Sequence, residues 1–511
     1  MTQDGSPDAV VIGAGPNGLV AANMLADHGW SVLLLEAQPE VGGAVRSDSE
    51  VQAGFVHDTF SAFYPLAAAS ATIRALRLEE HGLRWAHAPA VLGHVLPDGG
   101  WALLHRDRGV TAAGFEAQCA GDGEAWLDLC ATWDRIGDPL LSMLLRPFPP
   151  VFPALGLLTR LRGAGGLPLV RDLLSPASSL GRNLFRGPAP RRLLAGNAGH
   201  ADIPLDSPGS GLMALLMTML GQTVGFPAPV GGAGALSAAL AARFTALGGE
   251  VRCDAEVRRV VVDRGRATGV VLADGERIGV RRAVVADIAA PRLFGGLVEQ
   301  GDLPARVARG MRRFELDPAT IKVDWALSGP VPWNRAPAWA PGTVHLGGAR
   351  DPDPLVLVGQ MTTTDPTRSP AGTESLWSYT HVPQGGDWDA GSCERFADDL
   401  QARLETQAPG LASRVLARRV LGPRELEARN ANLVGGSIGG GTAQLHQQLV
   451  FRPVPGAGRA ETGITGLYLG SSSAHPGGGV HGACGSNAAR AAVLHDRLHH
   501  LTPRLTPWRT R

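Results

Sequence analysis

The feature that most constrains the fold of this chain is a glycine-rich segment near its N-terminus. An apolar stretch, residues 9–12, runs directly into Gly13, Gly15 and Gly18, and a helix of small residues is expected from there to about residue 28. A second apolar stretch, residues 32–35, leads into an acidic residue. Strand, glycines, helix, strand and acid follow in order within about 30 residues, which is typical of a dinucleotide-binding βαβ unit.

Each part of this unit has a mechanical reason. Gly13 permits the tight turn, Gly15 lets the backbone approach a pyrophosphate, and Gly18 allows the helix to pack closely on the strand. The helix N-terminus offers free N–H groups and partial positive charge to phosphates. Glu36 can accept hydrogen bonds from an adenosine ribose. Glycines alone would mean little in a chain that has 68 of them, but the ordered unit predicts a Rossmann-type site.

The segment after Glu36 favours FAD over NAD. A glycine pair, Gly42 and Gly43, is followed by Arg46, so backbone amides and a cation would lie beside the diphosphate and the flavin. Residues 231–234 imitate a second dinucleotide motif, but no apolar strand precedes them. We interpret them as a helix start that points at the cofactor cleft and not as a nicotinamide site.

A second glycine-rich segment lies near the C-terminus, in residues 466–493. It consists of an apolar strand at 467–469, a loop with Gly477, Gly478 and Gly479, and a helix expected from about residue 480. With the N-terminal unit, it resembles the closing motif of the phytoene-dehydrogenase-like branch of the FAD-dependent amine oxidase superfamily. Alternating strand segments in residues 248–287 resemble that family's return to the FAD domain in mid-chain.

The resemblance implies noncovalently bound FAD. His475 and Cys484 lie in the closing segment and could suggest a covalent link, but noncovalent family members carry similar residues. The backbone of Val257 would contact the adenine. The implied cofactor-binding set is Gly13, Gly15, Pro16, Asn17, Gly18, Glu36, Ala37, Gly43, Ala44, Arg46, Val257, Gly470, Ser471, Gly478, Gly479 and Val480.

The expected fold class is α/β. A discontinuous Rossmann-type, glutathione-reductase-like FAD-binding domain is joined to a second, α+β substrate domain with a mixed sheet and a helical cap. We expect the FAD domain to comprise residues 1–75, 225–290 and 455–500, the substrate domain residues 76–224 and 291–454, and a C-terminal tail residues 501–511. Strands are expected at 321–328 and 343–347, and amphipathic helices at 120–137 and 392–407.

Composition excludes several classes of function. The formal net charge is zero, so nothing favours nucleic acid as a partner. Five scattered cysteines show no CxxC or metal-ligand spacing, which indicates reduced thiols, a cytoplasmic protein and no metal site. The polar first residues are not a signal peptide, and no apolar run reaches the ~20 residues that span a bilayer. Residues 139–161 are apolar and carry Arg146 and Arg160, so they predict a channel mouth, a peripheral membrane contact or ordinary cap helices.

Three side chains are candidates for chemistry beside the flavin. Lys322, the one lysine of the chain, lies on an expected substrate-domain strand, and related amine oxidases hold a water near the flavin with such a lysine. His200 lies in a polar loop and could carry a proton. Tyr64 could line the pocket, with core packing as the alternative.

The expected function is that of an FAD-dependent oxidase or desaturase that takes a hydride from a lipophilic or natural-product-like substrate onto flavin N5. A redox-neutral isomerase of the carotenoid-isomerase type and a flavin amine oxidase are the alternatives, and a flavin-bound scaffold is a non-enzymatic one. The chain has no CxxxxC redox disulfide, which argues against a disulfide reductase. Oxygen or a quinone would then reoxidise the flavin.

Overall fold

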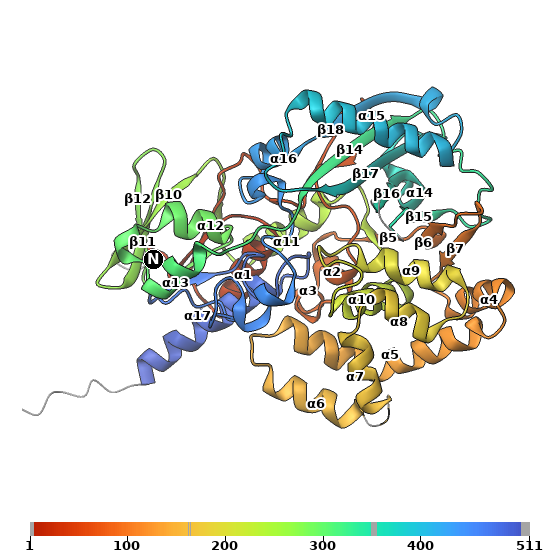
Figure 1. The fold of residues 1–511 in the computed structure, drawn as a ribbon. Helices are drawn as coiled ribbons and strands as arrows, with labels where there is room; N and C mark the ends of the chain where they lie inside the picture. The colour runs from red at the N-terminus through yellow and green to blue at the C-terminus, as the bar shows by residue number, and fades with distance from the viewer. Residues whose placement is uncertain (1–4, 162, 164, 349–354, 502–511) are drawn as a thin grey trace, which may run out of the picture.

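The computed structural model describes residues 5–161, 163, 165–348 and 355–501 of the 511-residue chain. Figure 1 shows two sheet regions side by side, with a layer of helices below one of them. Nearly all of the expected C-terminal tail, residues 501–511, lies outside the described residues. The division into two discontinuous domains remains a prediction, but the strands show how distant segments come together.

A five-stranded parallel sheet collects strands from both ends and the middle of the chain. Its order is β19-β13-β1-β2-β9. The strands are β1 (Ala9–Ile12), β2 (Val32–Leu35), β9 (Glu250–Arg252), β13 (Ala283–Ala286) and β19 (Leu467–Leu469). Four of them are short apolar runs buried on both faces, as expected for a parallel sheet covered on each side.

Three helices pack against this sheet: α1 (Pro16–Asp27), α11 (Gly234–Ala246) and α17 (Ala483–Leu501). Helix α1 lies in contact with both α17 and α11. The helix after the C-terminal glycine loop thus begins three residues later than expected. A three-stranded antiparallel sheet flanks the region, at the left of Figure 1: β10 (Val257–Asp263), β11 (Arg266–Leu272) and β12 (Arg277–Gly279). Arg264 and Gly265 join its first two strands with positive φ at both residues, as a tight hairpin turn requires.

The second sheet has seven strands in the order β18-β14-β17-β16-β15-β6-β7. Its strands are β6 (Ala90–Val95), β7 (Trp101–Leu104), β14 (Ala319–Leu327), β15 (Pro341–Leu346), β16 (Val356–Gln360), β17 (Glu374–Val382) and β18 (Val415–Leu421). The β15–β6 pair is parallel and the other pairs are antiparallel, so the sheet is mixed. The strands expected at 321–328 and 343–347 are confirmed as β14 and β15.

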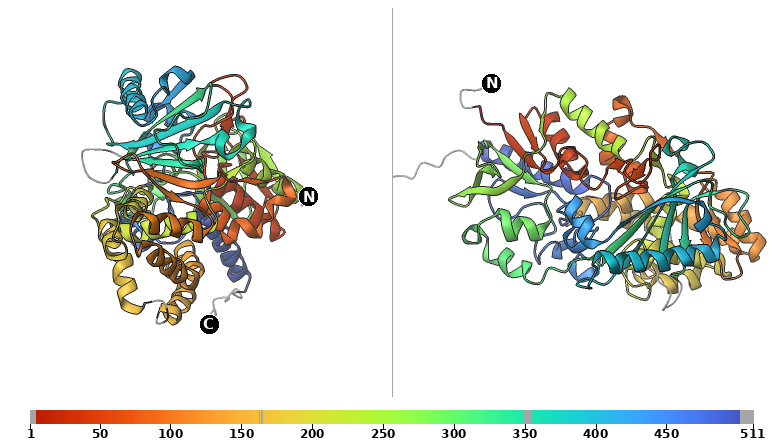
Figure 2. Two further views of the ribbon diagram at one scale, coloured as in Figure 1. Left: turned by 90° about the vertical axis from the view of Figure 1, so that its right-hand side faces the viewer. Right: turned by 90° about the horizontal axis from the view of Figure 1, so that it is seen from above.

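The two faces of β14 have different chemistry. Ile321, Val323 and Trp325 pack in one apolar cluster with residues of α15 (Ala390–Gln407), which runs along the sheet in the right-hand view of Figure 2. The alternate residues Lys322 and Asp324 are also buried but polar. Because side chains alternate along a strand, the polar face is directed away from α15, and it contributes to the cavity described below.

Two short antiparallel pairs also form, β3 (Ser47–Asp48) with β4 (His57–Asp58) and β5 (Trp85–Ala86) with β8 (Ala228–Pro229). Among the described residues, the helical layer is formed by seven helices. They are α4 (Arg108–Gln118), α5 (Asp122–Leu145), α6 (Val151–Leu161), α7 (Gly166–Leu174), α8 (Ala177–Leu184), α9 (Pro188–Ala198) and α10 (Ser210–Thr223). Their apolar core includes Trp126 and Phe185. Helices α6 and α7 project below the rest of the layer in Figure 1.

Short helices complete the connections. These are α2 (Pro65–Ala69), α3 (Ala71–Ala75), α12 (Ala290–Arg292), α13 (Ala305–Met311), α14 (Met361–Thr364) and α16 (Pro423–Arg429). Within the described ranges of the chain, no helix is long and apolar enough to cross a membrane.

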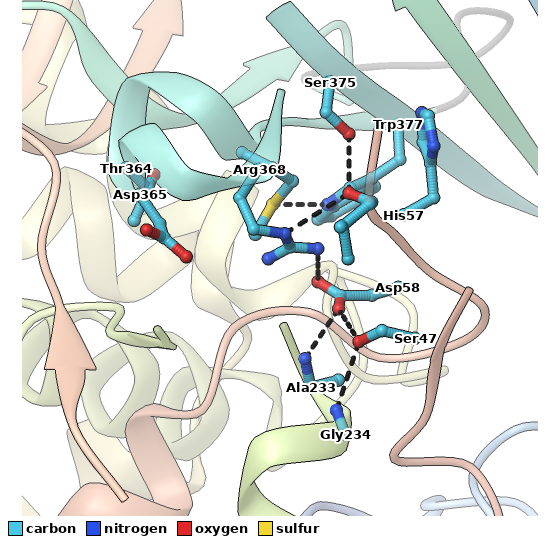
Figure 3. A network of polar contacts seen from close by, with 12 residues as sticks. Ser47, His57, Asp58, Ala233, Gly234, Thr364, Asp365, Arg368, Ser375 and Trp377 are labelled. Atoms are coloured by element: carbon cyan, nitrogen blue, oxygen red, sulfur yellow. Dashed lines mark hydrogen bonds and ion pairs between the residues drawn. The ribbon is translucent and has the colours of Figure 1, made fainter. Parts of the chain in front are cut away.

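A fully buried ion pair ties the two sheet regions together (Figure 3). Arg368 Nη2 lies 2.8 Å from Asp58 Oδ2, and both side chains are 0% exposed. The other carboxylate oxygen of Asp58 accepts hydrogen bonds from Ala233 N at 2.7 Å and Ser47 Oγ at 2.8 Å. Asp58 therefore connects strand β4, the loop before α11 and the segment after α14.

The expectation that residues 231–234 form a helix start pointing at the cofactor cleft is wrong in its direction. Gly231 N donates to Asp365 Oδ2 at 2.8 Å, and Gly234 N donates to Ser47 Oγ at 3.1 Å. The N–H groups at the start of α11 are thus bound to acidic and hydroxyl side chains of the chain itself. They do not line the cofactor cleft, because Asp58 and Asp365 occupy the position that an outside anion would take.

Candidate active site

A cavity of about 620 Å³ lies between the two sheet regions. One part of its wall comes from the loops at the carboxyl ends of β1, β2 and β13, where ligands bind in open parallel sheets. Another part comes from the polar face of the seven-stranded sheet, and a third from the turn after α9 (residues 200–202), α10 and the segment around Phe63. Residues distant in sequence are therefore combined in one site.

The N-terminal turn forms the cofactor end of this cavity. Gly13, Gly15, Pro16 and Asn17 line it. Glu36 follows β2 and also lines it, and its carboxylate accepts hydrogen bonds from Ala14 N at 2.7 Å and Gln38 N at 2.9 Å. These bonds hold the carboxylate beside the turn, at the place where a ribose would bind.

The segments around the turn can pack this closely only because these positions lack side chains. A Cβ atom on Gly15 would lie 2.7 Å from Asp287 Oδ2, and one on Gly43 would lie 2.9 Å from the Cα of Gly15. Arg46 lines the cavity, and its Nε is buried without a hydrogen-bond partner. A backbone cradle beside an unpaired guanidinium nitrogen fits a diphosphate.

Asp287, which our sequence reasoning did not select, completes this turn from the end of β13. Its Oδ2 accepts a hydrogen bond from Gly18 N at 2.8 Å. Burial, with a smaller contribution from the charge of Glu36, raises the pKa of Asp287 to about 7. The carboxyl group can therefore be neutral beside phosphates near neutral pH, where an ordinary aspartate would repel them.

Most of the predicted cofactor residues meet at this cavity. Besides those named above, the lining includes Ala37, Gly43, Ala44, Val257, Gly478, Gly479 and Val480. Three do not line it. Gly18 packs the helix against the turn, since a Cβ there would lie 2.0 Å from Gly13 O. Gly470 donates to Ala286 O within the sheet, and Ser471 Oγ accepts a bond from Ser473 N. Their neighbour Ser472 lines the cavity instead.

All three predicted catalytic residues line the cavity, and each makes hydrogen bonds within the protein. Lys322 donates from Nζ to Asp58 O at 2.9 Å and to Asp324 Oδ1, and burial lowers its pKa. Tyr64 donates its hydroxyl to Ser61 O at 2.7 Å, and burial raises its pKa. Both side chains therefore stabilise the fold through these hydrogen bonds, in addition to any part they take in catalysis.

His200, the third candidate, forms a buried imidazole pair. Its Nε2 lies 3.1 Å from Nε2 of His345, which is on β15 and 0% exposed. His94 of β6 packs edge-on against His345, with ring centroids 6.0 Å apart. Burial is the main cause that lowers the pKa of His200 to about 4, and the nearby charge of protonated His381 is a smaller one. The imidazole is therefore neutral at physiological pH.

The wall supplied by β17 was missed at the sequence level. Trp377, Tyr379 and His381 all line the cavity. Trp377 and Tyr379 are stacked with centroids 5.7 Å apart, and His381 meets Tyr379 edge-on at 5.7 Å. The signal was present, because these aromatic residues occupy every second position of one strand and so share a face.

A further glycine-rich loop, residues 435–441, was also missed. Asp317 accepts hydrogen bonds from the backbone N–H groups of Ile438, Gly439 and Gly441. Arg452, 0% exposed, donates to the carbonyls of Gly439 and Gly441 from the other side. The loop is thereby fixed as a wall of the cavity.

Neither residue considered for a covalent flavin link lines the cavity. His475 Nε2 donates to Arg146 O at 2.9 Å. Cys484 is buried, its thiol faces the carbonyls of Ala474 and Gly477, and burial raises its pKa to about 12. Such a thiol has little thiolate available as a nucleophile.

Comparisons with known proteins agree with this architecture. A family model for an NAD(P)-binding Rossmann-like domain matches residues 11–76. The rat protein named pyridine nucleotide-disulfide oxidoreductase domain-containing protein 2 is 31% identical, across 94% of this chain and 92% of its own. A neurosporene-forming phytoene desaturase of Rhodobacter capsulatus is 27% identical, across 57% of this chain and 58% of its own.

Solved structures show the same fold at lower identity. An oxidoreductase from Methanosarcina mazei superposes with a TM-score of 0.64 at 16% identity, covering 95% of this chain and 99% of its own. Putrescine oxidase bound to putrescine superposes with a TM-score of 0.60 at 18% identity, covering 96% of this chain and 99% of its own.

The resemblance to phytoene-dehydrogenase-like oxidoreductases that the sequence suggested is confirmed, because phytoene desaturases match more than half of the chain at 27% and 31% identity. The α/β fold class is likewise confirmed. More particularly, the chain belongs to the family of pyridine nucleotide-disulfide oxidoreductase domain-containing protein 2.

Proposed function

We propose that the chain binds FAD noncovalently and oxidises a largely apolar small molecule, as an oxidase or a desaturase. The observation that carries this proposal is the continuity of one cavity from the dinucleotide turn to an aromatic wall. Bound FAD would supply the acceptor for a hydride from the substrate, and oxygen or a quinone would then take the electrons.

The chain's own residues would orient the two reactants. Gly15 and Glu36 would hold the dinucleotide, and Arg46 would lie beside its diphosphate. Apolar side chains supply another part of the wall and would exclude water from the reacting centre. They are Phe63, Met213, Met217, Phe226 and Trp377.

Noncovalent attachment has a direct test. Denaturing the purified protein with acid should leave all of the flavin in the supernatant, because His475 and Cys484 are bonded to backbone carbonyls away from the cavity. Flavin that remained with the precipitated protein would contradict this part of the proposal.

A redox-neutral isomerase is the second candidate. The carrot prolycopene isomerase is 24% identical across 93% of this chain, a longer match than the phytoene desaturases give. Anaerobic mixing of the holoenzyme with a converted substrate separates the two functions. Lasting loss of the oxidised flavin absorbance supports oxidation, whereas product formation with the flavin still oxidised supports isomerisation.

Lys322 is proposed to act beside the flavin through its fixed ammonium group. Lys322→Met should slow flavin reduction or reoxidation while FAD stays bound, because the side chain lines the cavity but lies on β14, away from the dinucleotide turn. Stopped-flow measurement of the two half-reactions tests this. Wild-type rates in both would restrict Lys322 to its structural bond with Asp324.

We also propose that the α6–α7 hairpin contacts a membrane surface. Phe152 and Leu167 are each 83% exposed, and Leu155 and Leu158 on the same hairpin are more than half exposed. Residues 139–174 contain four arginines and one acidic residue, Asp172, which pairs with Arg171. An exposed apolar helix with basic flanks is suited to the interface of a membrane with anionic lipids. This contact would bring a lipophilic substrate close to the protein.

A further inference from the structure

The part of the cavity remote from the dinucleotide turn is not a purely hydrocarbon surface. Phe63, Phe226 and Met217 supply apolar area there, but two imidazoles, His200 and His381, line the same cavity. Each ring has two nitrogens, and a nitrogen that faces a wholly hydrocarbon ligand would have no hydrogen-bond partner there. The hydrogen bonds that these rings already make determine what they can offer to a ligand.

The His200–His345 contact restricts the tautomers of both rings. A hydrogen bond between two neutral imidazoles needs one protonated and one unprotonated nitrogen. His345 Nδ1 is buried without a partner, and a buried N–H without an acceptor is rarer than a buried acceptor without a donor. We therefore assign the proton of His345 to Nε2, which donates to His200 Nε2. His200 then carries its own proton on Nδ1, as a donor available to a ligand.

His381 is held through its Nδ1, whereas His200 is held through its Nε2. Its Nδ1 lies 3.3 Å from Thr320 Oγ1 on the neighbouring strand, and the backbone carbonyl of Ala319 also acts on the ring, which itself lines the cavity. Burial lowers the pKa of His381 and is the dominant effect, although the nearby carboxylates of Asp317 and Asp202 act in the opposite direction and raise it. The ring is therefore neutral, like that of His200.

Two of the cations that line the cavity already bind groups of the protein itself. Lys322 is paired with Asp324, and Arg452 donates from each of its three nitrogens to backbone carbonyls. A ligand anion would find neutral imidazoles and engaged cations around it. An uncharged ligand oxygen would find the N–H donor of His200 and the ring of His381 within a largely apolar part of the wall.

We infer that the substrate is an apolar molecule carrying one neutral oxygen function, such as a hydroxyl or ketone, that His200 and His381 bind, with His345 as the residue that positions His200. This inference rests on the proposed function, because it concerns the same cavity. It narrows the substrate class from lipophilic molecules in general to those with a hydrogen-bonding group at one place.

The test uses probes that share one carbon skeleton. The FAD-loaded full-length protein is titrated with decane, 1-decanol, 2-decanone, decanoate and decylamine, and binding is followed by the change in flavin absorbance. We expect the alcohol and the ketone to bind roughly 3- to 10-fold more tightly than decane, the range that a net hydrogen bond gives. Tighter binding of decanoate or decylamine, or equal binding of all five, overturns the inference.

Variants then assign the preference to residues. His200→Phe should abolish the preference for the alcohol and leave decane binding unchanged. His345→Phe should weaken it, whereas His345→Gln, whose amide can still donate to His200, should retain it. His105→Phe is the matched control, because His105 is buried but does not line the cavity. An undiminished preference in His200→Phe would overturn the assignment.

The two proposals can fail separately. If decane perturbs the flavin but the oxygen function adds nothing, the cavity over the flavin stands and this inference is wrong. If no probe perturbs the flavin, the cavity does not adjoin it, and the proposed function fails together with the inference.

Discussion

The carboxyl group of Asp287 lies against the glycine turn and links cofactor binding to pH. Its pKa, about 7, is above the ordinary range because burial disfavours the charged form. Below this pH the group is neutral, and above it a carboxylate faces the diphosphate beside the carboxylate of Glu36. The sign follows directly: FAD affinity should fall as pH rises through about 7.

The decrease should approach about 10-fold per pH unit above that pKa, since one proton is linked to binding. Titration of the apoprotein with FAD between about pH 6 and about pH 8.5 measures it by quenching of flavin fluorescence. Asp287→Asn, which is neutral throughout, should bind FAD with little pH dependence. An equally steep profile in that variant would assign the effect to another group.

Gly15 is the residue whose substitution should remove the cofactor outright. Any Cβ there meets the side chain of Asp287 at 2.7 Å, and a branched side chain would also enter the cradle. Gly15→Val should therefore give colourless protein on purification. Gly114→Val is the matched control, because nothing lies within 4 Å of that position. Normal flavin content in Gly15→Val would contradict the N-terminal site.

The residues that could be predicted from the sequence are those whose requirement is local. Gly13, Gly15 and Glu36 belong to one continuous βαβ unit, so their spacing alone indicates a role. Asp287 reaches the same turn from a strand about 270 residues later, and no spacing rule connects it to Gly18. His345 likewise meets His200 only through the fold.

Among the elements, the joint between strand β4, the loop before α11 and the segment after α14 depends on Asp58 and Arg368 (Figure 3). Arg368→Met would leave the Asp58 carboxylate buried without its counter-ion. The expected loss is about 3–5 kcal/mol of folding free energy, typical of breaking a buried pair from one side.

Thermal and denaturant unfolding of Arg368→Met measures this loss, and Arg108→Met is the matched control. Arg108→Met removes an exposed pair with Asp134 and should cost at most about 1 kcal/mol. Equal stability of the two variants would mean that water or another cation reaches Asp58.

Strand β17 shows why elements were easier to predict than their orientation. Its alternating aromatic residues are typical of a strand, but alternation leaves open which of the two faces is directed to a cavity. That choice depends on α15 covering the other face of the sheet, through contacts such as those of Trp325 and Leu400. The wall formed by Trp377, Tyr379 and His381 was therefore not identifiable before the fold.

At the scale of the whole molecule, the proposed membrane contact predicts binding to vesicles. The protein should sediment with vesicles of phosphatidylcholine and phosphatidylglycerol more than with phosphatidylcholine alone, since the hairpin carries Arg160 and Arg171. Phe152→Asp with Leu155→Asp should lower this binding about 10-fold or more, because each side chain loses apolar burial in the interface.

The matched control places the same changes on exposed apolar residues elsewhere. Leu247→Asp with Leu416→Asp alters two side chains that are 44% and 52% exposed and lie outside the hairpin. Equal vesicle binding by both double variants and the unaltered protein would assign the contact to another surface.

The five-stranded sheet also determines the order in which the protein can become functional. Strand β1 is synthesised long before β19, which can form only after residue 469 has been added, and α17 packs on α1 later still. The nascent chain therefore carries the glycine turn for most of its synthesis without the loop that closes the site. We therefore expect flavin to bind only once β19 has joined the sheet, and a chain truncated before that strand should not retain the cofactor.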